Sequence, residues 1–539
     1  MDRIGSGHFI NLSFLTMQQH LLSLIVFLPL ASACIMLFLP REGYDRFRII
    51  TLLFNALNMA LLGLLAYAHA RGFSAEINTS WFSIASGNGT VFSANYHLRT
   101  DGLSLPLLLL TGVVMFMATL ASDGIREQVK GYYILMQVLN TAILGSFAAA
   151  DMLLFYLFFE FMLVPMYFLI GIWGSTRREY AAVKFFLYTL AGSILILIGM
   201  IVLYVSTGIS DGQGHYTHTF DLDSLTALKG LIPGSVLDYA AGWQMLGLPA
   251  GWWVMLFILL GFAIKVPAVP FHTWLPDAHV EAPTPVSMVL AALLLKTGAY
   301  GIIRFGFMVL PAEVPAFRMV VAVAGVLSVI YGALNAMASD DLKRLIAYSS
   351  VSHMGFVMLG IAAGTSAAVS GAIFQLVSHG LVSAMLFMIA GILQRRTGDR
   401  TISNYSGLFS KMPRYSAFVL IAFFAGMGIP GFSSFIGEVL VLMGSYRAPG
   451  VVMWLPVTAT IGIILSAGYF LWTIQRMFFG SFQSKREGEL TDVSLHERII
   501  LIPLALMILF LGVFPSYLLD VISGFTTAWG MMFPVTPMP

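Results

Sequence analysis

Apolar residues follow one another along this chain in long runs, separated by shorter polar segments. A helix that crosses a bilayer needs roughly 20 mostly apolar residues. With that window the sequence predicts an all-α polytopic membrane protein with about fourteen spans. These spans are centred near residues 30, 60, 112, 140, 163, 195, 262, 297, 328, 353, 381, 428, 465 and 508.

Composition supports a membrane protein and excludes several function classes. The chain has 58% hydrophobic and 10% charged residues, with a mean hydropathy of +0.87, which no ordinary water-soluble domain carries. A net charge of +2 without a basic face argues against nucleic acid as a partner. The single cysteine, Cys34, excludes an intramolecular disulfide and a cysteine-built iron–sulfur site within the chain.

The long connections, 71–100 and 207–249, are expected on the same side of the membrane. Cytoplasmic loops carry an excess of Lys and Arg, and a topology with the N-terminus outside assigns about 19 of the 28 to the inner face. About 7 then lie outside and 2 lie within helices. Both termini are therefore predicted on the outer, periplasmic side. The richest inner segments are Arg41/Arg46/Arg48, Arg177/Arg178/Lys184, Lys343/Arg344, 395–414 and 476–498.

Two of the predicted spans are interrupted by proline, one at Pro267 and Pro270 and the other at Pro430-Gly431. Proline removes a backbone donor and clashes with the preceding turn, which is tolerated at membrane depth only beside protein or water. Interrupted helices in corresponding positions point to inverted repeats, as in transporters. The predicted division is 1–130 (helices 1–3), 131–310 (first repeat, helices 4–8), 311–480 (second repeat, helices 9–13) and 481–539 (last helix and tail).

Four ionisable residues lie within separate apolar runs: Glu160, Lys265, Lys296 and Glu438. A charge at the bilayer centre costs at least about 2.5–3.5 kcal/mol on insertion scales, so these side chains should face one another or water. Snorkelling to the interface or static ion pairing are the plainer alternatives. Four such residues on separate helices, two of which are interrupted, favour a polar pathway.

A buried ammonium loses proton affinity, and a nearby carboxylate restores it. Lys265 with Glu160 as a changeable neighbour is therefore a candidate proton switch. His353 and His379 are candidate relays because imidazole titrates near neutral pH, although a buried histidine is as often a hydrogen-bonded core residue.

Other polar residues near the apolar runs have plainer interpretations. Asp151 precedes the Glu160 run and is as readily a helix cap as a proton carrier. The grouping His272, Asp277, His279 and Glu281 matches no metal-ligand spacing, so no metal is assigned.

Three long segments resemble the antiporter-like membrane subunits of respiratory complex I: KVPAVPFHTWLPDAHVEAPTPVSMVLAALLLKTGAYGIIRF, DLKRLIAYSSVSHMGFV and GEVLVL. The resemblance extends from DGLSL at residue 101 to the last span. Within this family the sequence is most similar to the chain M (NADH dehydrogenase subunit 4) type, because Glu438 stands where related subunits have lysine and DMLLFYLFFEFMLVPMYFLIGIWG is similar to its fifth helix. One departure is APTPVS, in which Pro285 replaces the usual alanine.

The resemblance implies a proton-translocating subunit without cofactors of its own. It assigns Glu160 and Lys265 as a pair, Lys296 as the central relay, His353 and His379 as connectors, and Glu438 as the terminal exchange site. NADH, FMN, iron–sulfur clusters and quinone are implied in partner subunits. The implied partners are other complex I subunits, especially neighbouring antiporter-like ones, in the lipid bilayer of the bacterial inner membrane.

Two other functions remain open from the sequence. A subunit of a multi-subunit cation/proton antiporter, or of a related ion-pumping hydrogenase or dehydrogenase complex, shares most of these motifs, and Glu438 argues against the antiporter. A membrane scaffold whose buried charges only pair would tolerate their neutralisation.

Overall fold

Long apolar helices make up most of the chain in the computed structural model, which describes residues 5–85, 91–210, 212, 216–446, 448–484 and 490–533. Within these residues, eleven helices are long and apolar enough to cross a membrane. Apolar runs of this length become helices because a helix satisfies its backbone hydrogen bonds internally. The all-α membrane fold is confirmed, and the total of about fourteen spans stays a prediction.

Every predicted span centre falls on a helix or, for residue 428, between two helices. The helices are α1 (Gly5–Phe38), α2 (Tyr44–Ala70), α3 (Ser104–Ala121), α4 (Val129–Ala148), α5 (Met152–Phe161), α6 (Leu163–Trp173), α7 (Arg178–Ser206), α8 (Leu222–Leu225), α9 (Ala250–Lys265), α10 (Trp274–Glu281), α11 (Thr284–Val289), α12 (Leu295–Gly301), α13 (Val314–Ala338), α14 (Leu342–Ala363), α15 (Ser366–Thr397), α16 (Leu408–Lys411), α17 (Pro413–Gly426), α18 (Ser433–Tyr446), α19 (Trp454–Phe478), α20 (Leu495–Val513) and α21 (Ser516–Met532).

Short antiparallel strand pairs lie outside the helices. They are β1 (Glu76–Ala85) with β2 (Val91–Arg99), β3 (Gly208–Ser210) with β4 (Tyr216–His218), β5 (Gln244–Met245) with β6 (Leu248–Pro249), and β7 (Tyr405–Ser406) with β8 (Gln483–Ser484). The β1–β2 hairpin occupies much of the segment 71–100, for which the sequence predicted only a connection. Its pairing has an irregularity between Ser80 and Phe82, and such a break in register weakens the two-residue alternation that identifies a strand.

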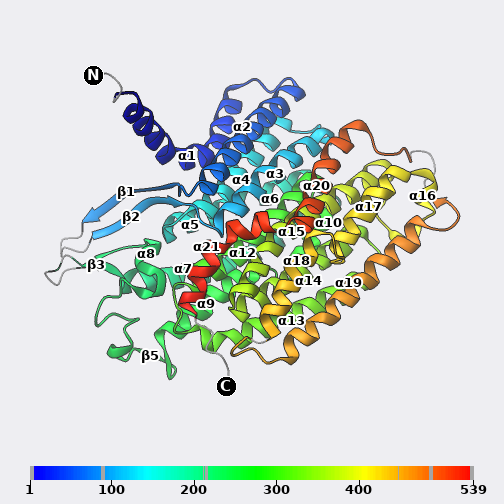
Figure 1. The fold of residues 1–539 in the computed structure, drawn as a ribbon. Coiled ribbons are helices and arrows are strands. Elements are labelled where there is room, and N and C mark those ends of the chain that lie inside the picture. Colours follow the sequence, from blue (N-terminus) through cyan, green and yellow to red (C-terminus); the bar gives the residue numbers. More distant parts are fainter. Residues whose placement is uncertain are drawn as a thin grey trace.

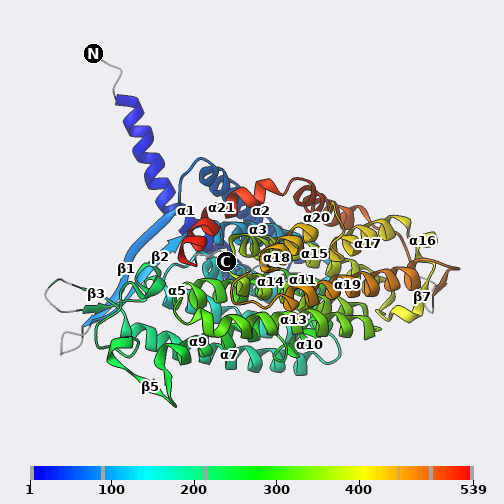
Figure 2. The same ribbon diagram turned by 60° about the horizontal axis from the view of Figure 1, so that its bottom comes forward.

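The loops gather at two opposite ends of the helix bundle (Figures 1 and 2). The hairpin face consists of β1, β2 and residues 207–249. The two long connections meet there, since Asn78 Nδ2 lies 3.3 Å from Asp221 Oδ2 and Ser93 Oγ donates to the His218 carbonyl at 2.7 Å. Their predicted placement on one side is confirmed.

The opposite end, the basic face, consists of loops 39–43, 122–128, 174–177, 339–341, 398–412 and 479–494, apart from residues outside the described part. Ion pairs, some partly exposed and some largely buried, join these loops and helix ends. Arg395 Nη1 lies 2.6 Å from Asp123 Oδ1, and Arg396 Nη2 lies 2.6 Å from Glu497 Oε2. Figure 1 shows α16 at this end, far from the hairpin.

Both predicted helix interruptions are confirmed. α9 ends at Lys265 and α10 begins at Trp274, so the break spans the segment with Pro267 and Pro270. α17 ends at Gly426 and α18 begins at Ser433, on either side of Pro430. Lys265 is the last residue before the first break, and Glu438 lies in the second turn of the helix that follows the second break.

The C-terminal region contains more helix than the predicted tail. After α20, α21 lies against the bundle, where Trp529 Nε1 donates to the Gly364 carbonyl at 2.9 Å. The domain limits at 310 and 480 fall between helices, and the limit at 130 falls in the first turn of α4. The repeats and their limits stay predictions, and the chain ends (1–4 and 534–539) lie outside the described residues.

Candidate functional site

Lys296 lies on a buried helix that widens into two π-helical segments. These segments, Leu290–Leu294 and Ile302–Phe307, flank α12. Lys296 has no exposed surface, and its Nζ donates to the Ala291 carbonyl at 2.7 Å. A π-helical turn disturbs the regular backbone ladder and often occurs at functional sites. Here a backbone oxygen five residues earlier is available to the ammonium.

Lys296 also lies 2.7 Å, Nζ to Nδ1, from His379 on α15. The ring centres of His379 and His353 are 5.5 Å apart. His353 Nδ1 lies 3.1 Å from Glu438 Oε1 on α18. Four of the predicted residues, from four different helices, thus lie in one row of two hydrogen-bonded pairs, and among the described residues no hydrogen bond joins the two histidine rings between them.

Two features beside Glu438 were not predicted. Gln375 Nε2 lies 3.4 Å from Glu438 Oε1 and 3.5 Å from His353 Nδ1, so its amide holds both groups. Gly428, in the break between α17 and α18, has a φ of +70° and packs directly on Glu438 Oε2. A side chain there would have to displace the carboxylate.

Glu160 and Lys265 form the other part of the predicted site. Lys265 is buried, and its Nζ lies 4.8 Å from the ring centre of Phe159 and 5.8 Å from that of Phe185. The ammonium interacts electrostatically with Glu160. Among the described residues, however, neither Lys265 Nζ nor Glu160 Oε1 has a hydrogen-bond partner. The two groups are coupled by charge without direct contact.

At the break after α9, a backbone carbonyl next to Lys265 is engaged by another protein group. The Ile264 carbonyl accepts a hydrogen bond at 2.9 Å from Trp274 Nε1, the first residue of α10. Aromatic faces attract cations through their quadrupole. The two phenylalanine rings therefore favour the charged form of Lys265, as the carboxylate of Glu160 does.

Together, Glu160, Lys265, Lys296, His379, His353 and Glu438 are called the buried polar axis below. In the described part of the chain, no hydrogen bond joins Lys265 to Lys296. Lys296 and Lys343 both act electrostatically on the ring of His279, and neither His279 nor Lys343 was assigned to the site from the sequence. His279 is stacked on Phe387 at 4.4 Å, and within the described structure neither of its ring nitrogens has a hydrogen-bond partner.

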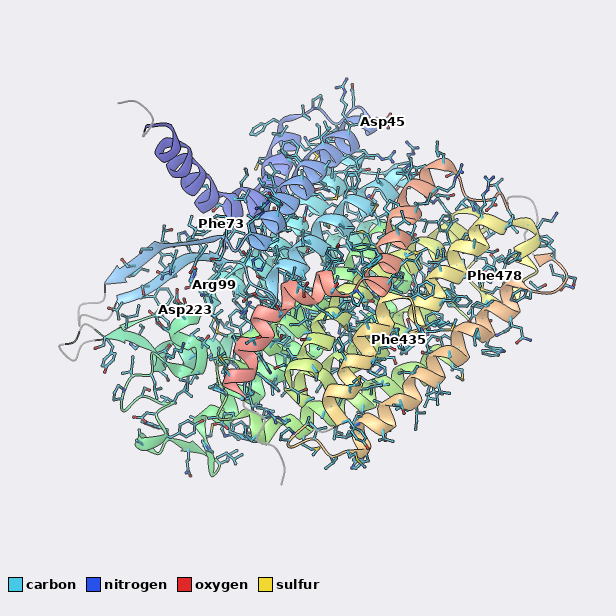
Figure 3. All side chains as sticks on the ribbon, in the orientation of Figure 1. Asp45, Phe73, Arg99, Asp223, Phe435 and Phe478 are labelled. Carbon is cyan, nitrogen blue, oxygen red and sulfur yellow. The ribbon has the colours of Figure 1, made fainter. Side chains whose placement is uncertain are left out.

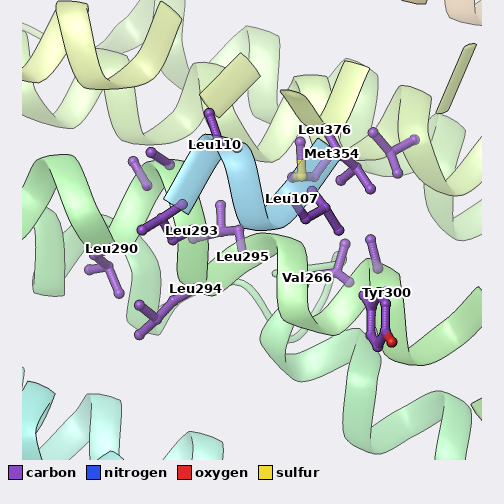
Figure 4. Packing of buried hydrophobic residues seen from close by; sticks show 14 of the residues in the cluster. Leu107, Leu110, Val266, Leu290, Leu293, Leu294, Leu295, Tyr300, Met354 and Leu376 are labelled. Atoms are coloured by element: carbon purple, nitrogen blue, oxygen red, sulfur yellow. The ribbon is translucent and has the colours of Figure 1, made fainter. Parts of the chain in front are cut away.

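Apolar side chains surround the central part of the axis. Figure 4 shows Leu107 and Leu110 of α3 beside the segment that carries Leu293 and Leu295, and all four are buried. A low-dielectric surrounding strengthens every electrostatic interaction along the axis. It also confines polar contacts to the side chains named above.

Asp151 caps α5, the helix that carries Glu160. Its Oδ1 accepts from the amides of Leu153 and Leu154 at 3.0 Å each. Its interpretation as a helix cap is confirmed. The unusual Pro285 lies in the first turn of α11, where proline is tolerated because the first amides of a helix have no partner within it.

One group of acidic and histidine side chains at the hairpin face is close enough together to be considered as metal ligands. Among the described residues, ligand atoms of Glu76, His97 and Asp223 lie within 4.8 Å of one another at the hairpin face, away from the axis. His97 bonds both Glu76 and Asp221, and Arg99 pairs with Asp223 at 2.7 Å. Because protein groups already engage these atoms, we assign no metal to them.

Known proteins are similar to this one along most of the chain. The family model described as "NADH:quinone oxidoreductase/Mrp antiporter, TM" matches residues 149–464. "NADH-quinone oxidoreductase subunit M" of Rhodobacter capsulatus is 38% identical over 511 residues, which cover 94% of this chain and 95% of the relative. "NADH-ubiquinone oxidoreductase chain 4" of Chondrus crispus is 39% identical over 431 residues, or 80% and 82% of the two chains.

Solved structures show the same fold. A chain of respiratory complex I from Thermus thermophilus with bound NADH superposes with a TM-score of 0.80 at 30% identity, covering 95% of this chain and all of the other. A chain of the Mrp complex from Dietzia has a TM-score of 0.78 at 19% identity, covering 96% and 98%. The second likeness concerns the fold alone.

Proposed function

Because the chain belongs to the family of NADH:quinone oxidoreductase and Mrp antiporter membrane subunits, we propose that its buried polar axis carries protons through the middle of the membrane. The chain is a proton-translocating membrane subunit of NADH:quinone oxidoreductase, complex I, of the subunit M or chain 4 type. Its partners are other complex I subunits. It acts as part of an enzyme complex.

The observation that carries the proposal is the run of contacts from Lys296 to Glu438. The hydrogen bond between Lys296 Nζ and His379 Nδ1 holds one proton that either nitrogen can keep. His353 Nδ1 and Glu438 Oε1 share the next such bond. Protons can therefore pass within each bonded pair, transfer between His379 and His353 requires a ring movement or a further carrier, and Glu438 is the terminal exchange site.

Glu160 sets the proton affinity of Lys265 in this proposal. A nearby carboxylate stabilises the ammonium, so any movement or neutralisation of Glu160 favours release of a proton from Lys265 Nζ. The lack of direct contact leaves the pair free to change its separation. Transfer between Lys265 and Lys296 requires a carrier other than a direct hydrogen bond.

The redox chemistry belongs to other subunits in this proposal. Those subunits would bind NADH, FMN, iron–sulfur clusters and quinone. The single cysteine of this chain, Cys34, could not hold an iron–sulfur cluster, which needs several thiolates. Movement along the buried polar axis would then be driven by quinone reduction elsewhere in the complex.

We propose further that the complex lies in a bacterial cytoplasmic membrane, with the basic face in the cytoplasm and both termini on the periplasmic side. Cytoplasmic loops carry an excess of Lys and Arg, and the basic face holds the richer loops. The neighbouring subunits in the membrane are expected to be antiporter-like chains.

A cation/proton antiporter subunit is the second candidate, because the family also includes Mrp antiporters. The full-length similarity to subunit M favours complex I. The carboxylate at 438 also favours complex I, since the sequence resemblance places lysine there in antiporter subunits. Co-purification of flavin and iron–sulfur spectra with the chain separates the two candidates.

The test of the proposed function is Lys265→Ala, with Lys229→Ala as an exposed control outside the axis. We expect proton pumping and quinone reductase activity per assembled complex to fall strongly in the first variant and to stay unchanged in the second. Equal activities at normal abundance would show that the buried charge is structural, as in a scaffold.

A further inference from the structure

A buried histidine links three elements at the hairpin face. His97 on β2 has no exposed surface. Its Nδ1 lies 2.7 Å from Asp221 Oδ2 and its Nε2 lies 2.9 Å from Glu76 Oε1. The histidine therefore ties both strands of the hairpin to the segment that precedes α8.

The same place anchors the beginning of α5. The amide of Ala150 donates to the His97 carbonyl at 2.8 Å, and the amide of Leu222 donates to the Ala150 carbonyl at 2.9 Å. Asp151 forms an isolated antiparallel bridge with Asp221. The first turn of α5 is thus tied to the hairpin and to the segment before α8.

Asp151 is the buried carboxylate at this meeting point. Besides its two cap bonds, its Oδ2 accepts from the amide of Asn95 on β2 at 3.3 Å. Glu160 lies nine residues further along, or roughly 14 Å at 1.5 Å per residue, on the same helix. A change in the capping turn can therefore reach the carboxylate of the buried polar axis through one rigid element.

The charged groups facing His97 are few and can be named. They are Glu76 on β1, Arg99 on β2, Asp221 just before α8 and Asp223 within α8. The charge of Asp221 also acts on the carboxyl group of Asp151. Figure 3 labels Arg99 and Asp223 side by side at this end of the molecule. The cluster holds more carboxylates than cations, so its charge balance depends on the proton of His97.

Both buried groups have shifted pKa values. Burial alone would lower the pKa of His97, but the carboxylates of Asp221 and Glu76 outweigh it and raise the pKa above the usual value. Burial raises the pKa of Asp151 to about 6, against the lowering effect of its backbone hydrogen bonds. The charged histidine stabilises the fold below its unfolded pKa of about 6.5. That contribution is lost as the pH rises through the higher folded value.

We propose that His97, Asp221 and Asp151 form a proton-responsive junction that positions the first turn of α5. With Asp151 ionised, the cap bonds and the helix dipole hold this turn. With Asp151 protonated, the charge that interacts with the helix N-terminus is gone. Removal of this buried charge nevertheless stabilises the closed turn, because burial makes the closed state bind the proton more tightly than an open, solvated turn does. Acidity at the hairpin face thereby tightens the start of the helix that carries Glu160, and the effect on turnover, though not on the helix itself, rests on the proposed function.

Hydrogen exchange in the assembled complex tests the junction directly. We expect the amides of Leu153 and Leu154, corrected for intrinsic rates, to exchange about two- to fivefold more slowly as the pH falls through the Asp151 transition. Asp151→Asn should abolish this step, because the amide cannot titrate. Asp151→Ser keeps a neutral helix cap and replaces Asn if that variant assembles poorly.

Asp238→Asn is the matched control. Asp238 also lies on the hairpin face and accepts two backbone amides, from Gly234 and Ala240, but it is far less buried. This variant should keep the wild-type step in α5. A step that persists in Asp151→Asn, or that is absent from the wild type, would overturn the junction.

Turnover separates the junction from the proposed function. In proteoliposomes whose hairpin-face pH is varied between pH 5 and 8, wild-type coupled turnover should change with the exchange step and Asp151→Asn should not. If hydrogen exchange shows the pH-dependent step but the coupled turnover of active complexes does not change over the same pH range, the junction does not regulate turnover. The proposed function itself would be rejected only if the Glu160→Gln variant pumped protons normally.

Discussion

Residue 296 requires a group that can both hold and release a proton. Lys296 contacts the Ala291 carbonyl and His379 within a fully buried space, which suits the small ammonium. We expect Lys296→Arg to lower coupled turnover about tenfold or more, because a guanidinium does not deprotonate at accessible pH. Proton pumping in membranes, normalised to complex abundance, is the measurement. Normal pumping would mean that the site needs only positive charge.

Glu438 lies where the axis ends and where the subunit type differs from its relatives. Glu438→Gln retains the shape and an oxygen for Gln375 but removes the titration, so coupled turnover should fall about tenfold while assembly is kept. Glu438→Asp should retain partial activity. Quinone reductase activity and pumping are measured together.

A buried carboxylate outside the axis provides the control for Glu438→Gln. Glu313, at the hairpin face, is 7% exposed and accepts a hydrogen bond from Tyr239. Glu313→Gln should retain pumping per assembled complex. Full pumping by Glu438→Gln at normal abundance would make this carboxylate structural.

At the residue scale, the sequence could identify the charged members of the axis but not their contacts. Glu160, Lys265, Lys296 and Glu438 were predictable because a charge inside an apolar run is costly and rare. The pairing of Lys296 with His379 spans 83 residues, and nothing local in the sequence specifies it. Gln375 was missed because a neutral amide in an apolar helix is far less costly than a charge.

At the element scale, the prolines predicted the two breaks, but the sequence did not predict the backbone conformation around them. Gly428 and Gly431 both have positive φ values, of +70° and +95°, in the break before α18. The π-helical segments beside Lys296 contain no proline, and their single glycine, Gly306, does not by itself predict a π-helical turn. The β1–β2 hairpin was missed because its residues lie outside the apolar runs on which the spans were predicted.

The break before α18 yields a paired prediction. Gly428→Ala and Gly431→Ala each place a side chain in the left-handed region, at a cost of about 1–2 kcal/mol. Only the first also presses on Glu438 Oε2, whereas the second meets no atom within 4 Å. We therefore expect similar losses of thermal stability but a much larger loss of coupled turnover in Gly428→Ala. Equal turnover in the two variants would show that Glu438 tolerates displacement.

At the scale of the whole molecule, the two ends of the bundle have different roles. The hairpin face joins β1–β2 to the start of α5, whereas the basic face holds loops tied by exposed or partly exposed ion pairs such as Arg395 with Asp123. Loop grouping was predictable, because successive spans alternate in direction. The hydrogen-bonded connection between the hairpin and α5 was not, since it depends on side chains from segments far apart in the sequence.

Labelling with an impermeant maleimide tests the orientation of the two faces. Cys34 is the single cysteine, so Cys34→Ala gives a background into which Ala240→Cys and Lys411→Cys can be introduced separately. Both positions are exposed, the first on the hairpin face and the second on the basic face. The excess of Lys and Arg predicts that the basic face is cytoplasmic. In intact cells stripped of their outer membrane, the reagent should label residue 240 and spare residue 411, and inverted vesicles should show the reverse. Labelling of residue 411 from outside would invert the predicted topology and place the hairpin face in the cytoplasm.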